Sequence, residues 1–305
     1  MSQHIDIVAA DGRTLRGTLY RAVSGVIPSA VEGSPATRGE SGASEGDPST
    51  ALGMTHATDR AVLINSAMGV RRRYYDAFAH FLAANGFNVV TFDYRGVGDS
   101  RNGSLRTDDA SLRDWGLLDI PAAIDWIHRE LRPRTLSVVG HSAGGQLVGL
   151  APNAKTLERA VLVASQSGSW RLWPGLRKYG LAALWYTMPL IARAAGYFPS
   201  KLLGLGSEDL PRNVATQWAV WGQHRDYLFA FNDTRGYGEL RLPILAVSFA
   251  DDSYAPRLAV EALLERYPAA TIDHRHVGPR GIKHFGFFRR GVCEELWADT
   301  VTFLR

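Results

Sequence analysis

The pattern of apolar and polar positions along the chain predicts an α/β protein. Short apolar runs bounded by turn residues alternate with longer segments that carry apolar residues three and four positions apart. We expect eight strands, at residues 5–8, 14–20, 61–64, 87–92, 135–139, 159–163, 244–248 and 271–277. The first two flank Asp11-Gly12, a sequence typical of a tight hairpin turn.

Helical spacing follows most of the later strands. We expect helices at 74–85, 114–131 and 256–266, one that begins at or just after Ser142, and a final helix that ends at Leu304. Strands that alternate with helices favour a mostly parallel sheet with right-handed crossovers and helices on both faces.

Two segments interrupt this alternation. Residues 24–59 are rich in Gly, Ser, Pro, Ala and Thr and hold few large apolar side chains, so we expect a disordered insertion. Residues 167–240 hold five of the eight tryptophans and suggest a helical, aromatic-rich cap over the carboxyl edge of the sheet. The expected core is therefore residues 1–166 and 241–305, and the expected cap is residues 167–240.

The charge balance gives no support to a nucleic-acid partner. The formal net charge is +4, and the basic residues are scattered apart from Arg71-Arg72-Arg73. No lysine-rich tail, zinc spacing or RNA-binding signature accompanies them, so a solvated face is the interpretation. The single cysteine, Cys293, rules out an intrachain disulfide and is expected to be a buried structural thiol.

The hydrophobic segments are too short or too interrupted for a membrane span. The first ten residues have no apolar stretch of signal-peptide length. The most apolar window, residues 181–198, contains Pro189 and Arg193. We therefore expect no integral membrane span and a cytoplasmic location.

The strongest chemical signal is Gly140-His141-Ser142-Ala143-Gly144. This G-x-S-x-G pattern lies between an expected buried strand and an expected helix, the context in which a serine sits on a sharp turn as a nucleophile. Side chains two residues away on either side would collide at such a turn, so glycines are required there. The start of a helix behind Ser142 also favours negative charge.

Together with two further segments, this pattern resembles the α/β-hydrolase superfamily. Residues 92–100, Phe-Asp-Tyr-Arg-Gly-Val-Gly-Asp-Ser, resemble a segment of the serine-aminopeptidase and monoacylglycerol-lipase-like group that is usually structural. Residues 67–70, followed by Tyr74-Tyr75, resemble a bacterial subset of predicted hydrolases. The resemblance covers most of 60–166 and 242–305. It implies an α/β-hydrolase fold, with a mostly parallel eight-stranded sheet and a helical cap, and acyl transfer through Ser142.

In this superfamily the catalytic residues follow the chain order Ser, then an acid, then His. Asp251 and Asp252 both follow the strand at 244–248. Asp252 is favoured because Pro256, four residues later, resembles a common turn of the family, and Asp251 stays open as the alternative. The acid that is not used is expected to be exposed or to cap the next helix. His284, in the loop after the last strand, is the expected base.

The remaining histidines fit other roles. His274 and His276 lie within the last strand pattern, and the side chain of His141 is expected to point away from the Ser142 hydroxyl. Two backbone N–H groups should form the oxyanion hole, and the resemblance assigns one to Ala143. The other belongs to the loop 65–70, where Asn65-Ser66 replaces the usual His-Gly. Counting in register gives Ala67, with Met68 as the alternative.

The expected function is hydrolysis of a carboxylic ester or thioester in a small acyl substrate, without metal or organic cofactor. Two alternatives stay open: an acyltransferase that uses the same Ser142, Asp252 and His284, and a ligand-binding protein on a hydrolase scaffold. The sequence leaves the natural substrate and the oligomeric state open.

Overall fold

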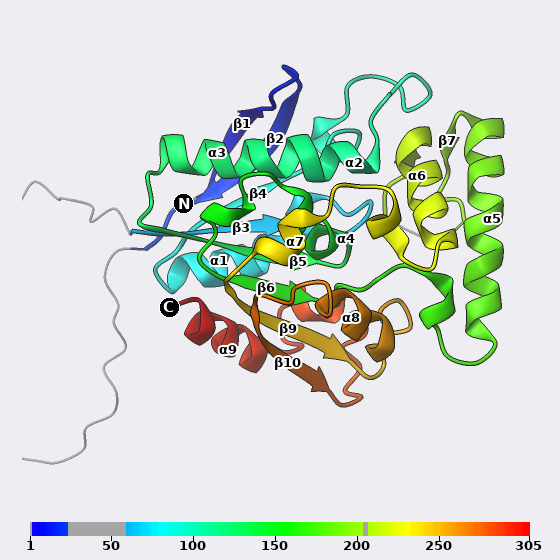
Figure 1. The fold of residues 1–305 in the computed structure, drawn as a ribbon. Coiled ribbons are helices and arrows are strands. Elements are labelled where there is room, and N and C mark those ends of the chain that lie inside the picture. Colours follow the sequence, from blue (N-terminus) through cyan, green and yellow to red (C-terminus); the bar gives the residue numbers. More distant parts are fainter. Residues whose placement is uncertain (1, 24–58, 204–206) are drawn as a thin grey trace, which may run out of the picture.

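The computed structural model describes residues 2–23, 59–203 and 207–305 (Figure 1). The expected disordered insertion lies outside the described residues except for Asp59. The main sheet has eight strands in the order β1-β2-β4-β3-β5-β6-β9-β10. Their bounds are β1 Ser2–Val8, β2 Thr14–Tyr20, β3 Arg60–Asn65, β4 Asn88–Phe92, β5 Thr135–His141, β6 Ala160–Val163, β9 Pro243–Phe249 and β10 Thr271–Val277.

The sheet confirms the predicted mostly parallel arrangement. β1 and β2 form an antiparallel hairpin, with Gly12 of the expected turn at φ 82°, and β2 also pairs antiparallel to β4. Every later pairing, from β4 to β10, is parallel. The carboxyl ends of these parallel strands therefore meet at one edge, which is where an open α/β sheet holds its ligands.

Helices cover both faces of this sheet (Figure 1). Those of the core are α1 Asp76–Ala84, α2 Leu112–Asp114, α3 Ile120–Glu130, α4 Ala143–Gln146, α8 Arg257–Leu264 and α9 Glu294–Leu304. The helix expected at 114–131 is interrupted by a π turn at Trp115–Asp119. The helical spacing of the sequence did not predict this turn. In it, the indole of Trp115 donates a hydrogen bond to the Arg95 carbonyl.

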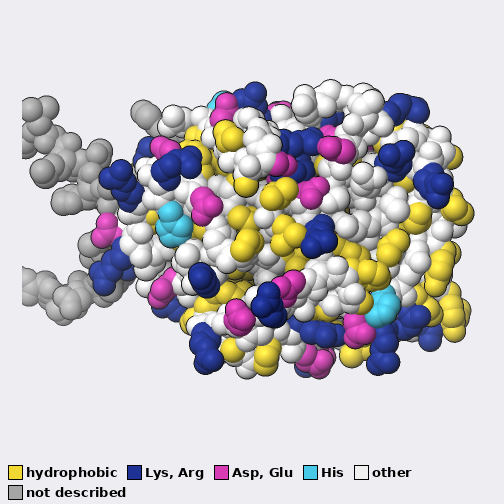
Figure 2. All heavy atoms as spheres, turned by 45° about the horizontal axis from the view of Figure 1, so that its top comes forward, with side chains coloured by type: hydrophobic (Ala, Val, Ile, Leu, Met, Phe, Trp, Pro, Cys, Tyr) yellow, Lys and Arg dark blue, Asp and Glu magenta, His cyan; other side chains and the backbone are white. Residues whose placement is uncertain are grey.

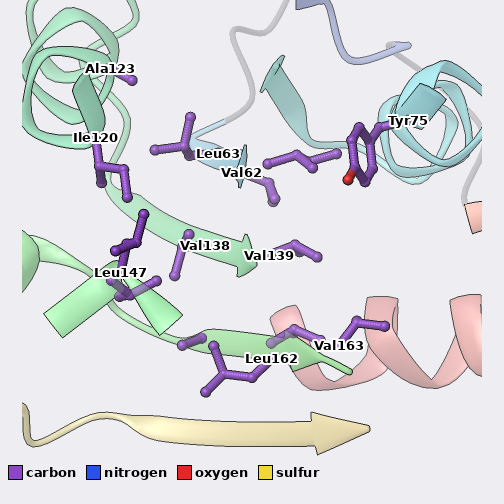
Figure 3. Packing of buried hydrophobic residues seen from close by; sticks show 14 of the residues in the cluster. Val62, Leu63, Tyr75, Ile120, Ala123, Val138, Val139, Leu147, Leu162 and Val163 are labelled. Atoms are coloured by element: carbon purple, nitrogen blue, oxygen red, sulfur yellow. The ribbon is translucent and has the colours of Figure 1, made fainter. Parts of the chain in front are cut away.

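Side chains of the central strands alternate between the two faces of the sheet and pack into the core. Figure 3 shows one set of strand residues on the side of α3 and α4 and the next residues on the side of Tyr75. The first set includes Leu63, Val138 and Leu162, and the second includes Val62, Val139 and Val163. Because these six side chains are at most 2% exposed, both faces of the central strands are apolar, as parallel strands covered by helices should be.

The aromatic segment after β6 extends beyond the carboxyl edge of the sheet (Figure 1). It contains β7 Tyr197–Phe198, β8 Leu210–Pro211, α5 Arg177–Ala195, α6 Arg212–Gln223 and α7 Arg235–Glu239. α5 and α6 pack together through a small apolar cluster that includes Trp185, Met188 and Ala219. The expected division into a core and a cap at residues 167–240 stays a prediction.

The segment Asp93–Ser100 lies beside the sheet and carries buried ion pairs. Asp93 accepts hydrogen bonds from the Arg72 amide and guanidinium, and Arg95 binds Asp119 at 2.6 Å and Asp11 at 2.7 Å. Burial raises the pKa of Asp119 to about 6, and the Arg95 charge opposes that rise. These contacts fix the turn after β4, which agrees with the structural role that the resemblance implied.

Candidate active site

The nucleophile candidate sits on a strained turn between β5 and α4. Ser142 has φ 51° and ψ −116°, a backbone conformation that residues other than glycine rarely adopt. A Cβ on Gly140 would lie 2.4 Å from the Gly145 Cα, and one on Gly144 would lie 2.3 Å from the Asn65 carbonyl oxygen. The glycines on either side of Ser142 are therefore needed for backbone to pack against backbone.

An acid and a base meet next to this turn. The Nδ1 atom of His284 lies 2.8 Å from Oδ2 of Asp252, and both residues are about 95% buried. The other carboxylate oxygen of Asp252 accepts hydrogen bonds from the amides of Tyr254 at 2.7 Å and Ala255 at 3.1 Å. Asp252 is thus fixed by its own turn, and a proton on Nδ1 leaves the Nε2 lone pair of His284 free.

Asp251 makes different contacts from its neighbour. Its carboxylate accepts hydrogen bonds from the amides of Gly281 at 2.7 Å and Lys283 at 3.2 Å. The structure therefore differs from the expectation that the acid not used would be exposed or would cap the next helix. Asp251 is half-buried. Its hydrogen bonds connect the turn that follows β9 to the loop that carries His284.

A buried series of hydrogen bonds links two loops of the site to the end of β5. The Ala67 amide donates to the Tyr75 hydroxyl at 2.8 Å, and that hydroxyl lies 2.9 Å from Nδ1 of His141. The Nε2 atom of His141 lies 2.9 Å from the carbonyl oxygen of His284. Because a carbonyl can only accept, Nε2 of His141 carries the proton, and Nδ1 accepts from Tyr75.

The sequence patterns did not predict this series of hydrogen bonds. The expectation was only that His141 would point away from the Ser142 hydroxyl, and no sequence signal pairs it with Tyr75, which lies 66 positions earlier. The only available hint was the resemblance that included Tyr74-Tyr75. Tyr75, His141 and His284 are all buried. Their hydrogen bonds therefore fix the loop after β3, the end of β5 and the His284 loop relative to one another.

The same hydrogen bonds determine which backbone amides are available for the expected oxyanion hole. Because the Ala67 amide donates to Tyr75, it is not free to bind a developing oxyanion. Within the described residues, the amides of Met68 and Ala143 donate no hydrogen bond to the protein. In the same residues, the Ser142 hydroxyl makes no hydrogen bond to Nε2 of His284, although catalytic hydrogen bonds often tighten only when substrate binds.

A small apolar pocket, with a cavity volume of about 90 Å³, adjoins these groups. Met68, Gln166 and Tyr254 line it from the sheet edge, and the ring of Tyr254 lies 5.2 Å from that of His284. The remaining wall includes these apolar residues of the segment after β6: Trp173, Leu181, Leu184, Trp185, Met188, Phe198, Leu210 and Trp218. A pocket of this lining favours an apolar group next to the site.

The remaining site expectations concern other histidines, metals and membranes. His274 and His276 are half-buried on β10, and a ring nitrogen of each lies 2.8 Å from the Ser248 hydroxyl. Across residues 2–23, 59–203 and 207–305, no group of three or more His, Cys, Asp or Glu side chains is arranged to hold a metal ion. In the same ranges, no helix is long and apolar enough to cross a membrane.

Comparison with known proteins decides the family. A profile of the alpha/beta hydrolase family matches residues 61–293. The chain belongs to this family. A protein of Caulobacter sp. (strain K31) named "Putative carbamate hydrolase RutD" is 26% identical over 238 residues, which cover 74% of this chain and 85% of that protein.

Solved structures show the same fold at low identity. The esterase Pf2001 of Pyrococcus furiosus has a TM-score of 0.60 at 14% identity, and the match covers 100% of this chain and 89% of the esterase. DcsB, solved in complex with its substrate analogue, has a TM-score of 0.64 at 16% identity, with 100% and 99% of the two chains covered. These matches confirm the α/β-hydrolase fold.

The buried imidazole of His141 generates a prediction about stability and pH. Burial, with His284 beside it, holds the pKa of His141 well below its usual 6.5. The unfolded chain therefore binds a proton just below pH 6.5 that the folded protein does not, so this group favours folding above that pH and the advantage is lost as the pH falls. In His141→Asn, the slope of the unfolding free energy against pH below 6.5 should be smaller by about 1.4 kcal/mol per pH unit.

Urea unfolding at several pH values between 5 and 6.5 measures this slope, roughly the range in which histidine titrates. His224→Asn, which removes an exposed imidazole, is the matched control. An unchanged slope in His141→Asn would contradict a neutral, buried His141.

Proposed function

We propose that this chain is a serine hydrolase that cleaves a carboxylic ester or thioester through an acyl-enzyme on Ser142. The observation that carries the proposal is the 2.8 Å contact between His284 and Asp252 beside the strained Ser142 turn. Membership of the alpha/beta hydrolase family makes hydrolysis the reaction class to test. A serine needs a base, and the base needs an orienting acid, so these three residues form a complete set.

In the proposed reaction, Nε2 of His284 takes the Ser142 proton as the hydroxyl oxygen attacks the substrate carbonyl. Asp252 holds the imidazole in the tautomer with a proton on Nδ1 and stabilises the imidazolium that forms. His284 then protonates the leaving alcohol or thiol. Water attacks the acyl-enzyme with His284 again as base, which releases the acid and restores Ser142.

We assign the oxyanion hole to the amides of Ala143 and Met68. Ala67, the donor expected from register, is the weaker candidate because its amide donates to Tyr75. Ala143 begins α4, so its amide also benefits from the positive end of that short helix. Met68 lines the apolar pocket, which would place the second donor at the mouth through which a substrate carbonyl enters.

The substrate class that fits best is a small molecule with an apolar acyl or aryl group. The pocket next to Met68 and Tyr254 is walled mainly by apolar and aromatic side chains. The name of the similar Caulobacter protein, "Putative carbamate hydrolase RutD", refers to a carbamate, which also has a carbonyl bonded to a heteroatom. A cap formed by residues 167–240 over a core of 1–166 and 241–305 would enclose the apolar group.

The first test is turnover of p-nitrophenyl esters of several chain lengths. Wild type should hydrolyse them, and Ser142→Ala should reduce kcat by about a millionfold because the nucleophile is lost. Ser253→Ala removes an exposed hydroxyl beside Asp252 and should retain turnover. Equal inertness of wild type and Ser142→Ala would contradict the proposal and favour a ligand-binding role. Faster product release with an added acceptor alcohol would point to acyl transfer.

A second test separates the two adjacent acids. Asp252→Asn should lower kcat by about ten thousandfold, because the amide no longer favours the required tautomer of His284. Asp251→Asn keeps one oxygen, which can accept from the amide of Gly281 or of Lys283, and it leaves the contact between Asp252 and His284 in place, so its kcat should fall far less. Steady-state kinetics of both variants on the same ester decide the matter, and the opposite ranking would assign the acid to Asp251.

A further inference from the structure

The longest helix of the segment after β6 is apolar on two opposite faces. On α5, the side chains of Leu181, Leu184, Trp185 and Met188 line the apolar pocket. The opposite face carries a second row at spacings of three and four residues, which we call the outer stripe: Leu176, Tyr179, Ala183, Tyr186 and Leu190. A helix periodicity of 3.6 places these five residues along one line.

The outer stripe is exposed to solvent. The exposed fractions are 83% for Leu176, 66% for Leu190, 58% for Tyr179 and 55% for Tyr186. Figure 2 shows hydrophobic side chains gathered along the end of the molecule that α5 occupies in Figure 1. A helix with apolar side chains on all sides is normally covered on all sides, and a contiguous exposed apolar patch marks an interaction surface.

The charged residues of α5 itself are all basic. From Ser169 to Ser207 the sequence contains no Asp or Glu but five basic residues: Arg171, Arg177, Lys178, Arg193 and Lys201. Of these, Lys201 forms an ion pair with Glu208 at 3.3 Å, so it does not contribute a free charge. Helical geometry places Arg193 directly beside the outer stripe and Lys178 at its flank, where Nζ of Lys178 lies 5.1 Å from the ring centre of Tyr179. The surface that covers the stripe should therefore be apolar within and anionic at its boundary.

We propose that α5 docks on an anionic lipid bilayer, with the outer stripe in the interface and the basic residues against lipid headgroups. Leucine and tyrosine on one face and Lys and Arg beside them are the composition of an interfacial helix. Tyrosine is favoured at headgroup level, and anionic lipids attract such basic segments. A second copy fits less well, because two apposed stripes would bring like charges together.

Docking in this orientation would serve the pocket on the inner face of α5. That face lines the apolar pocket, so the bilayer and the pocket would be separated only by the helix itself. Apolar acyl compounds concentrate in a bilayer, which would supply them next to the site. The docking surface itself does not depend on the proposed Ser142 chemistry, because lipid binding is measured without turnover.

The experiment is co-sedimentation with vesicles of phosphatidylcholine alone and of phosphatidylcholine mixed with phosphatidylglycerol. Wild type should bind the mixed vesicles at least about tenfold more tightly, and added salt should weaken that binding. The double variants Tyr186→Ser/Leu190→Ser and Lys178→Gln/Arg193→Gln should each lower the affinity by about tenfold or more. Their matched controls change an exposed leucine of α8 and an exposed arginine of α3, as Leu258→Ser and Arg129→Gln, and should bind like wild type.

Turnover of a water-soluble ester and thermal unfolding of each variant report whether the fold is intact. Variants of the outer stripe or of the basic residues that lose vesicle binding but keep normal turnover support the docking surface. Vesicle binding by wild type that is inert on every ester also supports it, because docking is independent of the proposed reaction. Three results overturn it: wild type that fails to pellet with the mixed vesicles, outer-stripe variants that bind like wild type, or a dimer in light scattering that Tyr186→Ser/Leu190→Ser dissociates. The last result would assign the stripe to a second copy of the chain.

Discussion

The conformation of the Ser142 backbone is the constraint on which the site depends. A residue with a side chain holds a positive φ at this turn because β5 lies between β3 and β6 and α4 packs directly behind it. That close packing leaves no room for a Cβ at Gly140 or Gly144. The central strands therefore fix where the Ser142 hydroxyl projects, and the other groups are brought to it by loops at the same edge of the sheet.

Those loops are held together by two sets of hydrogen bonds. Asp252 binds the His284 ring, whereas Asp251 binds the backbone just before it, so one pair of adjacent acids orients both the imidazole of His284 and its loop. Tyr75 and His141 form the second set and join the loop after β3 to the same region. Buried and mutually satisfied polar groups of this kind keep an active site rigid.

The fold could be predicted from the sequence because strand and helix periodicities are local. The turn at Ser142 was recognisable for the same reason, since its glycines lie within two residues. The Tyr75–His141 contact and the engagement of the Ala67 amide join positions far apart in the chain, so no spacing reveals them. The aromatic segment after β6 was recognised by composition, but only burial shows that Trp185 faces inward and Tyr186 outward.

We propose that Ser142 is a nucleophile activated by its surroundings. The most direct test is the intact mass of the protein after exposure to a small fluorophosphonate, followed by mapping of the modified peptide. We expect a single adduct on the peptide that contains Ser142, and no adduct in Ser142→Ala. An adduct that persists in Ser142→Ala, or an unmodified wild type under conditions that label a known serine esterase, would contradict it.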